Sequence, residues 1–271
     1  RQVLPLPNDK ESWEKLNIMF STSKGTVRRN ALSDFVKIQS SGKIAMKLSD
    51  DDKLIGVHTC EEKEDDVFLS TKEGKCLRFP ISNVRKFSGR NSVGVRGIRL
   101  SKEDTVISMY ILKHAKFTID ERNDYLKIAN AIRRKELRRS MPFSKLSKGS
   151  NLSEEKFNQM ESIEEFILSV ADNGYGKRSS AYEYRITSRG GKGIANMTVS
   201  KKTGKVVSSF PVNEKDDVML ITGTGKLIRS PVNKIRVAGR TTQGVTLFKV
   251  ESGEKVLSSA SIKDLNINSE E

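Results

Sequence analysis

Residues 188–197, SRGGKGIANM, contain residue types that bind phosphate groups. Within them, Arg189-Gly190-Gly191-Lys192-Gly193 combines three glycines with two cations, and glycine-exposed amides with Arg and Lys are typical of DNA-backbone contacts. A nucleotide loop needs Gly-x-x-x-x-Gly-Lys-Ser/Thr between a strand and a helix. Here a glycine follows the lysine, and the next residues, IANMTVS, are typical of a strand. The stretch therefore predicts a DNA-phosphate contact, or a turn with incidental charge, rather than an ATP site.

Few other side chains could do chemistry. His58 and His114 are the only histidines, both expected in a strand or at its end, and they form no Ser-His-Asp or Cys-His arrangement. Cys60 and Cys76 lack metal or redox spacing, which indicates reduced thiols in a cytoplasmic protein. The acidic run at 50–52 falls where a turn is expected. We expect neither a catalytic set nor a metal site.

The charge of the chain indicates a polyanionic partner. Its 271 residues include 49 Lys and Arg against 34 Asp and Glu, a formal charge of +15. Such an excess favours nucleic acid or an anionic membrane surface. No apolar run of about 18 residues is present and no signal peptide is found, so we expect no membrane span. The hydrophobic content of 35% favours several small sheets over one thick sandwich.

Four internal repeats must position these groups. Each has a short apolar run, a polar turn with a glycine, a run that ends in arginine, a loop with a second glycine, and a last apolar run. Four antiparallel strands recurring at about 50 residues predict a propeller-like array of blades. The opening RQVLPLP resembles the last strand of an earlier blade. The turn glycines, repeated arginines and second glycines are Gly25, Gly74, Gly174, Gly225; Arg29, Arg78, Arg178, Arg229; and Gly42, Gly94, Gly193, Gly244.

Residues 114–163 interrupt the repeats with helical periodicity. Asp120 is the expected N-cap of a first helix with Tyr125, Ile128, Ile132 and Leu137 on one side. A second helix is expected after Asn151, with Leu152, Phe157, Met160 and Ile163 as its apolar side. The chain thus divides into the end of a preceding blade plus two blades (1–113), a basic helical hairpin (114–163), and two blades with a short tail (164–271). The hairpin is either an extra DNA clamp or a decoration packed on the blades.

Four motifs carry a family resemblance: VFLSTKEGKCLRF, NSVGVRGIRL, NGYGKRSSAYEY and GRTTQGVTLFKV. They resemble the C-terminal domain of the bacterial DNA gyrase A subunit over nearly the whole chain except the helical insertion. The resemblance implies an all-β fold, a β-pinwheel whose blades exchange strands. Residues 189–193 match the last five positions of the family's wrapping box, Gln-Arg-Arg-Gly-Gly-Lys-Gly, but lie in a later blade, as a degenerate copy of a loop that every blade has.

The resemblance also implies a function: wrapping duplex DNA around a basic rim, so that an ATP-dependent type II topoisomerase introduces negative supercoils. The implied partners are the ATPase B subunit and the catalytic region of the A subunit in an A2B2 holoenzyme, in the cytoplasm with the nucleoid. ATP and Mg²⁺ would be used elsewhere in the holoenzyme, with no cofactor in this chain, and the DNA-cleaving tyrosine has no counterpart here. The alternatives are the equivalent domain of the topoisomerase IV A subunit, or a propeller-like protein-interaction scaffold.

The candidate DNA contacts form two groups. The repeated arginines either contact DNA or bind carbonyls and carboxylates at blade junctions, whereas their neighbours Arg28, Lys177 and Lys226 are expected at the surface. The loops that lead to the second glycines would place basic residues at regular intervals along a curved rim. The full set is Arg28, Arg29, Arg78, Arg85, Lys86, Arg90, Lys177, Arg178, Arg185, Arg189, Lys192, Lys226, Arg229, Arg236 and Arg240.

Overall fold

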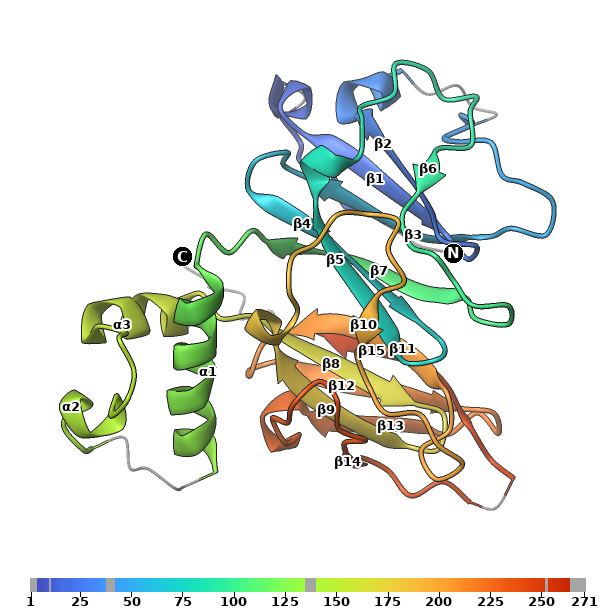
Figure 1. The fold of residues 1–271 in the computed structure, drawn as a ribbon. Coiled ribbons are helices and arrows are strands. Elements are labelled where there is room, and N and C mark those ends of the chain that lie inside the picture. The colour runs from blue at the N-terminus through green and yellow to red at the C-terminus, as the bar shows by residue number, and fades with distance from the viewer. Residues whose placement is uncertain (1–3, 10, 38–41, 135–139, 252, 264–271) are drawn as a thin grey trace, which may run out of the picture.

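The molecule is a row of four antiparallel β-sheets, seen here in a computed structural model that describes residues 4–9, 11–37, 42–134, 140–251 and 253–263 (Figure 1). Three sheets have four strands, in the orders β3-β1-β2-β6, β10-β5-β4-β7 and β11-β8-β9-β14. The fourth has three strands within the described residues, in the order β13-β12-β15. We call them blades 1 to 4 in chain order. The predicted all-β blade array is confirmed.

The elements follow one plan in each repeat: a hairpin, a short 3-10 helix, a long loop, and a last strand. The bounds are η1 (Glu11–Glu14), β1 (Asn17–Thr22), β2 (Thr26–Ala31), η2 (Leu32–Phe35) and β3 (Leu54–Cys60); β4 (Asp65–Thr71), β5 (Lys75–Pro80), η3 (Ile81–Asn83), β6 (Val95–Arg96) and β7 (Val106–Lys113); β8 (Phe166–Ala171), β9 (Tyr175–Ser180), η4 (Ala181–Glu183), β10 (Ile194–Ala195) and β11 (Val206–Val212); β12 (Asp217–Thr222), β13 (Leu227–Pro231), η5 (Val232–Lys234), β14 (Val245–Thr246) and β15 (Val256–Ile262).

Neighbouring blades exchange a strand, as the family resemblance implied. The two-residue strands β6, β10 and β14 belong to the second, third and fourth repeats, yet they pair with β2, β5 and β9 of the blade before. The second glycine of the second, third and fourth repeats makes this crossing possible. A Cβ on Gly193 would lie 2.6 Å from the carbonyl oxygen of Cys76, and Gly193 has a φ of +75°. Only glycine lets the crossing chain come this close.

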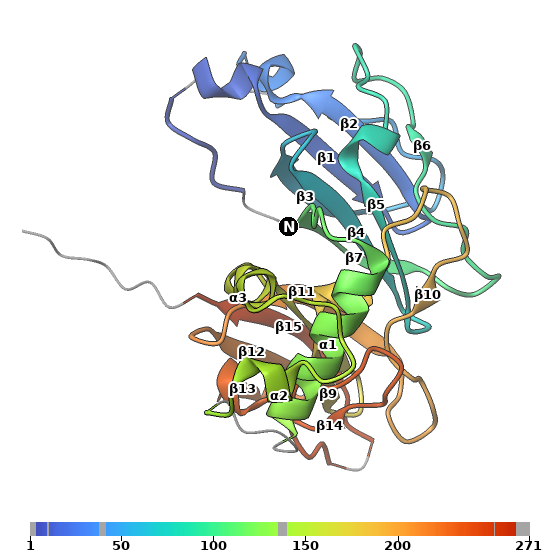
Figure 2. The same cartoon turned by 60° about the vertical axis from the view of Figure 1, so that its left-hand side comes forward.

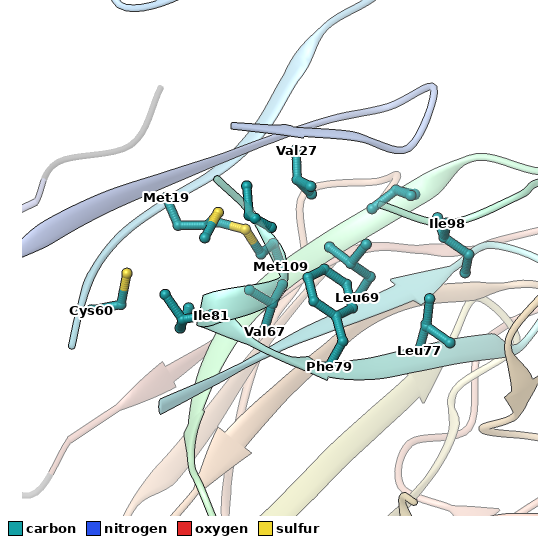
Figure 3. Close-up of a cluster of buried hydrophobic side chains, with 12 residues drawn as sticks. Met19, Val27, Cys60, Val67, Leu69, Leu77, Phe79, Ile81, Ile98 and Met109 are labelled. Carbon is teal, nitrogen blue, oxygen red and sulfur yellow. The ribbon is translucent and has the colours of Figure 1, made fainter. Parts of the chain in front are cut away.

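Apolar side chains fill each space between successive blades. Met19 and Val27 of blade 1 meet Val67, Leu69 and Phe79 of blade 2 (Figure 3). Equivalent clusters join blades 2 and 3 through Phe68 and Tyr184, and blades 3 and 4 through Leu168 and Leu220. A blade between two others is therefore covered on both faces. All seven residues of β4 are buried as a result, polar ones included, so such polar groups need partners inside the protein.

The insertion contains α1 (Ile119–Arg133), α2 (Phe143–Leu146) and α3 (Glu154–Ser162), so its described part has three helices where a two-helix hairpin was predicted. The predicted caps were also displaced. Thr118, not Asp120, caps α1: its hydroxyl accepts from the Glu121 amide at 3.2 Å, and the Glu121 carboxylate accepts from the Thr118 amide at 2.8 Å. This reciprocal pair satisfies two amides at once, which a cap at Asp120 would not do. Ser153, not Asn151, caps α3.

The insertion packs on blade 3. Tyr125 and Ile128 of α1 are buried with Phe157 and Met160 against Tyr182 of η4, and the Tyr182 hydroxyl donates to the carbonyl of Met160 at 2.8 Å. The apolar sides predicted for the helices are thus largely confirmed. The exception is Ile163, which is 55% exposed, while Leu137 lies outside the described residues.

The start of the chain differs from the prediction. Residues 4–9 form no strand; Leu4 and Leu6 pack instead beside Trp13 of η1. The Trp13 indole donates to the carbonyl of Pro7 at 2.9 Å. Pro5 and Pro7 have no amide hydrogen for a strand ladder, which explains why this apolar alternation does not form one.

The turn glycines provide a first prediction. Gly74 has a φ of +77°, and a Cβ there would lie 2.3 Å from the carbonyl oxygen of Met197. Its counterpart Gly225 has a φ of +82° with nothing within 4 Å. Gly225→Ala should cost only the strain of a left-handed backbone, about 1–2 kcal/mol. Gly74→Ala should cost at least about 2 kcal/mol more, since the backbone that follows the exchanged strand β10 must move. Equal shifts in urea unfolding of the two variants would contradict this account.

Candidate nucleic-acid interface

Three basic loops lie beside the second strands of the preceding repeats. We call residues 85–94, 185–193 and 236–244 the rim loops. Each follows a 3-10 helix, runs beside the second strand of the blade before it, and ends in an exchanged strand. Parallel bridges hold their starts: Arg29 to Lys86, Arg78 to Ile186, and Arg178 to Val237. The exchanged strands that end them, β6, β10 and β14, follow one another along one side of the row (Figure 2).

Three of the repeated arginines are buried at blade junctions. Arg29, Arg78 and Arg178 are 3%, 2% and 5% exposed. Arg178 donates from Nε to the carbonyl of Ile235 at 2.8 Å and pairs with Glu214 at 3.2 Å, while Arg29 pairs with Glu62 at 3.1 Å. Of the two roles considered for these residues, their placement favours the junction. Arg229 differs, because it is exposed and pairs with Asp217.

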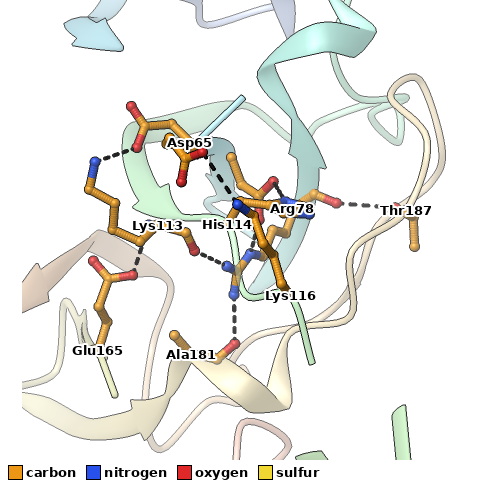
Figure 4. A network of polar contacts seen from close by, with 10 residues as sticks. Asp65, Arg78, Lys113, His114, Lys116, Glu165, Ala181 and Thr187 are labelled. Carbon is orange, nitrogen blue, oxygen red and sulfur yellow. Dashed lines mark hydrogen bonds and ion pairs between the residues drawn. The ribbon is translucent and has the colours of Figure 1, made fainter. Parts of the chain in front are cut away.

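Arg78 is the centre of the junction between blade 2, the insertion and blade 3 (Figure 4). Its Nε lies 2.8 Å from the buried Asp66 carboxylate, while its Nη1 and Nη2 donate to the carbonyls of Ala181 at 2.9 Å and Lys113 at 2.7 Å. His114 Nδ1 lies 2.7 Å from the other Asp66 oxygen. One arginine thus ties three segments of chain together.

Arg28 and Lys177 are fully buried, contrary to the surface position predicted for them. Arg28 Nη1 donates to the carbonyl of Ser92 at 2.5 Å, and Nη2 donates to that of Gly89. Lys177 Nζ donates to the carbonyl of Gly239 at 2.6 Å. Strand alternation turns these side chains away from the repeated arginines, but a rim loop of the next repeat covers that face. They hold a rim loop in place and are not available to DNA.

Lys177 makes folding depend on pH. Burial lowers its pKa to about 7, although Glu183 acts to raise it. In the unfolded chain lysine titrates near 10.4, so between these pH values the unfolded state binds more protons and stability rises with pH. Replacing Lys177 by Met should remove this pH-dependent part of the unfolding free energy. From pH 7.5 to 9.5, the unfolding free energy of wild type should therefore rise relative to that of the variant by up to about 1.4 kcal/mol per pH unit. Parallel stability curves for the two proteins would contradict it.

A third set of arginines clamps each rim loop to the repeat before it. Nη1 of Arg90, Arg189 and Arg240 donates to the carbonyls of Ile44, Arg96 and Ala195 at 2.7, 3.0 and 2.8 Å. The acceptor is in each case the second residue after the second glycine of the preceding repeat. These arginines are only partly buried. Each therefore keeps guanidinium surface beside the loop it fixes.

Most of the predicted DNA-contact residues that are exposed lie on the rim loops. Lys226 pairs with Glu251 at 2.5 Å, and Arg229 with Asp217, so both are partly neutralised. The others have no ion pair among the described residues: Arg85, which stacks on the Phe87 ring at 4.3 Å, with Lys86, Arg185, Lys192 and Arg236. These five side chains are the ones that remain free for a polyanion.

Two exposed arginines were missed in the sequence. Arg96 and Arg99 follow the second glycine of the second repeat, and they lie against residues 189–191: Arg189 donates to the Arg96 carbonyl, and the Arg99 amide donates to the Gly191 carbonyl at 2.8 Å. From the sequence, only the strand exchange implied by the family resemblance could have pointed to them, because the exchange brings these two residues to the next rim loop.

The loop at 189–193 is a crossing between blades and carries basic side chains. The Gly190 amide donates to the carbonyl of Gly97 at 2.5 Å, and the chain continues into strand β10 rather than a helix. A hollow of about 260 Å³ beside it is lined by Arg185 and Lys192 among others. The backbone thus holds the loop down, and the charges at its edge remain for an anion.

The remaining candidate groups are the two cysteines and the two histidines. The described residues contain no cluster of three His, Cys, Asp or Glu that could hold a metal ion. Cys60 and Cys76 are buried free thiols whose pKa values burial raises to about 12. His58 lies in β3 and His114 directly follows β7, as predicted. Across the described part of the chain, no helix is long and apolar enough to cross a bilayer.

Comparisons with known proteins agree with this architecture. The family described as "DNA gyrase C-terminal domain, beta-propeller" matches residues 16–61, 65–113, 165–213 and 216–263. The DNA gyrase A subunit of Rickettsia bellii is 49% identical over 269 residues, which is 99% of this chain and 30% of that protein. Its Escherichia coli counterpart is 32% identical over 264 residues, 94% of this chain and 24% of that protein. The chain thus spans less than a third of the length of these relatives.

Solved structures show the same fold. A DNA gyrase A C-terminal domain superposes with a TM-score of 0.66 at 21% identity, covering 95% of this chain and 69% of that one. The C-terminal domain of a DNA topoisomerase IV superposes with a TM-score of 0.69 at 18% identity, covering 95% and 64%. The four matched segments coincide with the four repeats, whereas the helical insertion lies outside them. This chain belongs to the DNA gyrase C-terminal domain family.

Proposed function

We propose that this chain binds duplex DNA along its rim loops and bends it. The observation that carries the proposal is the placement of Lys86, Lys192 and Arg236, which are exposed on three successive rim loops. A duplex carries one charge per roughly 1.7 Å of axis, so cations spaced along a curved edge can hold and bend it without reading bases. A protein-interaction scaffold would need no such repeated charge.

Within a gyrase, the bend would present a neighbouring DNA segment to the catalytic region of the A subunit with one sign of crossing. The ATPase B subunit would then drive strand passage and introduce negative supercoils. This assigns the chain to an A2B2 holoenzyme in the cytoplasm, associated with the nucleoid, with ATP and Mg²⁺ used on other parts. The 49% identity to a gyrase A subunit supports gyrase over topoisomerase IV.

A linking-number measurement tests the proposal. The chain is incubated with nicked circular DNA at low salt, the nick is ligated, and the topoisomers are separated after the protein is removed. A protein-dependent shift of consistent sign is the expected result, because a duplex bent around a row of blades of fixed hand is held chirally. DNA binding with no shift would refute wrapping by this chain, and no binding would refute the DNA interface itself.

A further inference from the structure

The helical insertion forms one wall of a large cleft beside the rim loops. The cleft has a volume of about 1410 Å³ and lies between α1, the residues around η4, and the segment 233–242 of the fourth repeat. Figure 2 shows α1 beside blades 3 and 4. We propose that this cleft binds one phosphodiester strand of the duplex that follows the rim loops, so that the insertion works as a clamp. The inference rests on the proposed function and adds a site to it.

The cleft is strongly cationic. Eight of its lining residues are basic and two, Glu183 and Glu214, are acidic. Both acids are engaged: Glu183 accepts from the Arg240 amide at 2.7 Å, and Glu214 pairs with Arg178 at 3.2 Å. Five of the cations have no ion pair among the described residues: Arg122, Arg185, Lys234, Arg236 and Arg240. They come from three separate segments, so the excess charge is a property of the cleft rather than of one basic run.

The side of α1 that lines the cleft differs from the side that packs. Tyr125, Ile128 and Ala129 are buried in the core of the insertion. Asn123 and Asn130, one turn before and after Leu126, line the cleft instead. Amide side chains donate hydrogen bonds to phosphate oxygens. This helix therefore offers neutral donors between the cations of its two ends.

Arg122 of α1 carries a guanidinium close to the junction around Arg78. It is 8% exposed, and its one hydrogen bond to the described residues is a long one, 3.4 Å from Nε to the Thr118 carbonyl. Burial and the charge of Arg78 lower its pKa, which Asp66 partly opposes. A guanidinium has five N–H donors. Most of the donors of Arg122 are therefore left for an anion in the cleft.

The cleft is continuous with the surface that the rim loops form. Arg185 lines both this cleft and the hollow beside residues 188–194, where Lys192 lies. A duplex whose backbone contacts Lys192 can therefore reach Arg185, and then Arg236 and α1. This continuity points to a nucleic acid backbone rather than to a small anion as the occupant.

Binding of a fluorescent 40-base-pair duplex to the full chain tests the proposal. The cleft variant is Asn123→Glu with Asn130→Glu. The control is Lys127→Glu, an exposed residue of the same helix that does not line the cleft and gives the same change in net charge. The cleft variant should lose about tenfold or more in affinity at 50 mM salt. If each introduced carboxylate neutralises one cleft cation, two ionic phosphate contacts are lost and the slope of log K against log salt should become shallower by about 1.8. The control should stay within twofold of wild type.

Two further experiments, DNA cleavage by an attached reagent and pyrophosphate binding, distinguish the possible outcomes. Iron-EDTA attached to Asn123→Cys should cleave the backbone of bound duplex, and both native thiols are buried, so the reagent is confined to the cleft. Wild-type affinity in the cleft variant, with affinity lost when rim-loop lysines are reversed, would overturn the clamp and leave the proposed function standing. No duplex binding by wild type would overturn both. Pyrophosphate bound one to one, lost in the cleft variant without a change in duplex affinity, would mark a small-anion site instead.

Discussion

Duplex DNA affinity of this chain should fall about 10³- to 10⁵-fold when salt rises from 50 to 200 mM. This is the effect of neutralising 6 to 10 phosphates, because each neutralised phosphate releases condensed counterions. The exposed cations on the rim loops, with the partly exposed Arg90, Arg189 and Arg240, are enough to reach that number of contacts. The measurement is a titration of a labelled duplex by fluorescence anisotropy at several salt concentrations.

Charge reversal on the rim loops should remove a defined part of this salt-dependent affinity for duplex DNA. In the triple variant Arg85→Glu, Lys86→Glu, Lys192→Glu, three lost contacts should make the salt slope shallower by about 2.7 and weaken binding about 100-fold or more at 50 mM salt. A matched control reverses the exposed Lys15, Lys63 and Lys215, which lie outside the rim loops, and changes the net charge equally. Equal losses in both triples would show that only net charge matters and would refute a rim interface.

Replacing Arg78 by Met should destabilise the fold by about 3–5 kcal/mol, the cost of leaving a buried charge without its partner. Asp66 is fully buried, and Arg78 gives it a contact at 2.8 Å. The same substitution removes the hydrogen bonds to the carbonyls of Lys113 and Ala181. The loss should therefore weaken the contact between blades 2 and 3. Urea unfolding followed by circular dichroism gives the value.

The fourth repeat supplies the control for this effect. Arg229 pairs with Asp217 as Arg78 pairs with Asp66, but the Arg229 side chain is 65% exposed. Arg229→Met should cost less than about 1 kcal/mol, as exposed ion pairs do. Adding Asp66→Asn to Arg78→Met should recover part of the loss, because it removes the unpaired charge. Similar losses for Arg78→Met and Arg229→Met would show that burial of the pair is not what matters.

The repeat pattern was enough to predict the blades. Apolar runs of fixed length, turn glycines and a second glycine fix local structure, and their recurrence fixes the number and order of the blades. The second glycine recurs in the sequence at Gly94, Gly193 and Gly244. The structure gives the reason, because the crossing chain leaves no room for a Cβ there. Helix caps were less well predicted: Thr118 and Asp120 are both good capping residues, and the capping box with Glu121 decided between them.

The exposure of the basic residues was decided by tertiary structure. Arg28 and Lys177 lie next to buried arginines in a strand, so alternation alone directs them outward. The rim loop that covers Arg28 comes from residues 61 and 64 positions further along the chain, and the one over Lys177 from 62 positions. The walls of the cleft likewise come from residues as distant as Arg122 and Arg236. Local sequence thus determined what each blade is, whereas strand exchange between repeats determined which cations face solvent, because burial depends on segments that only folding brings together.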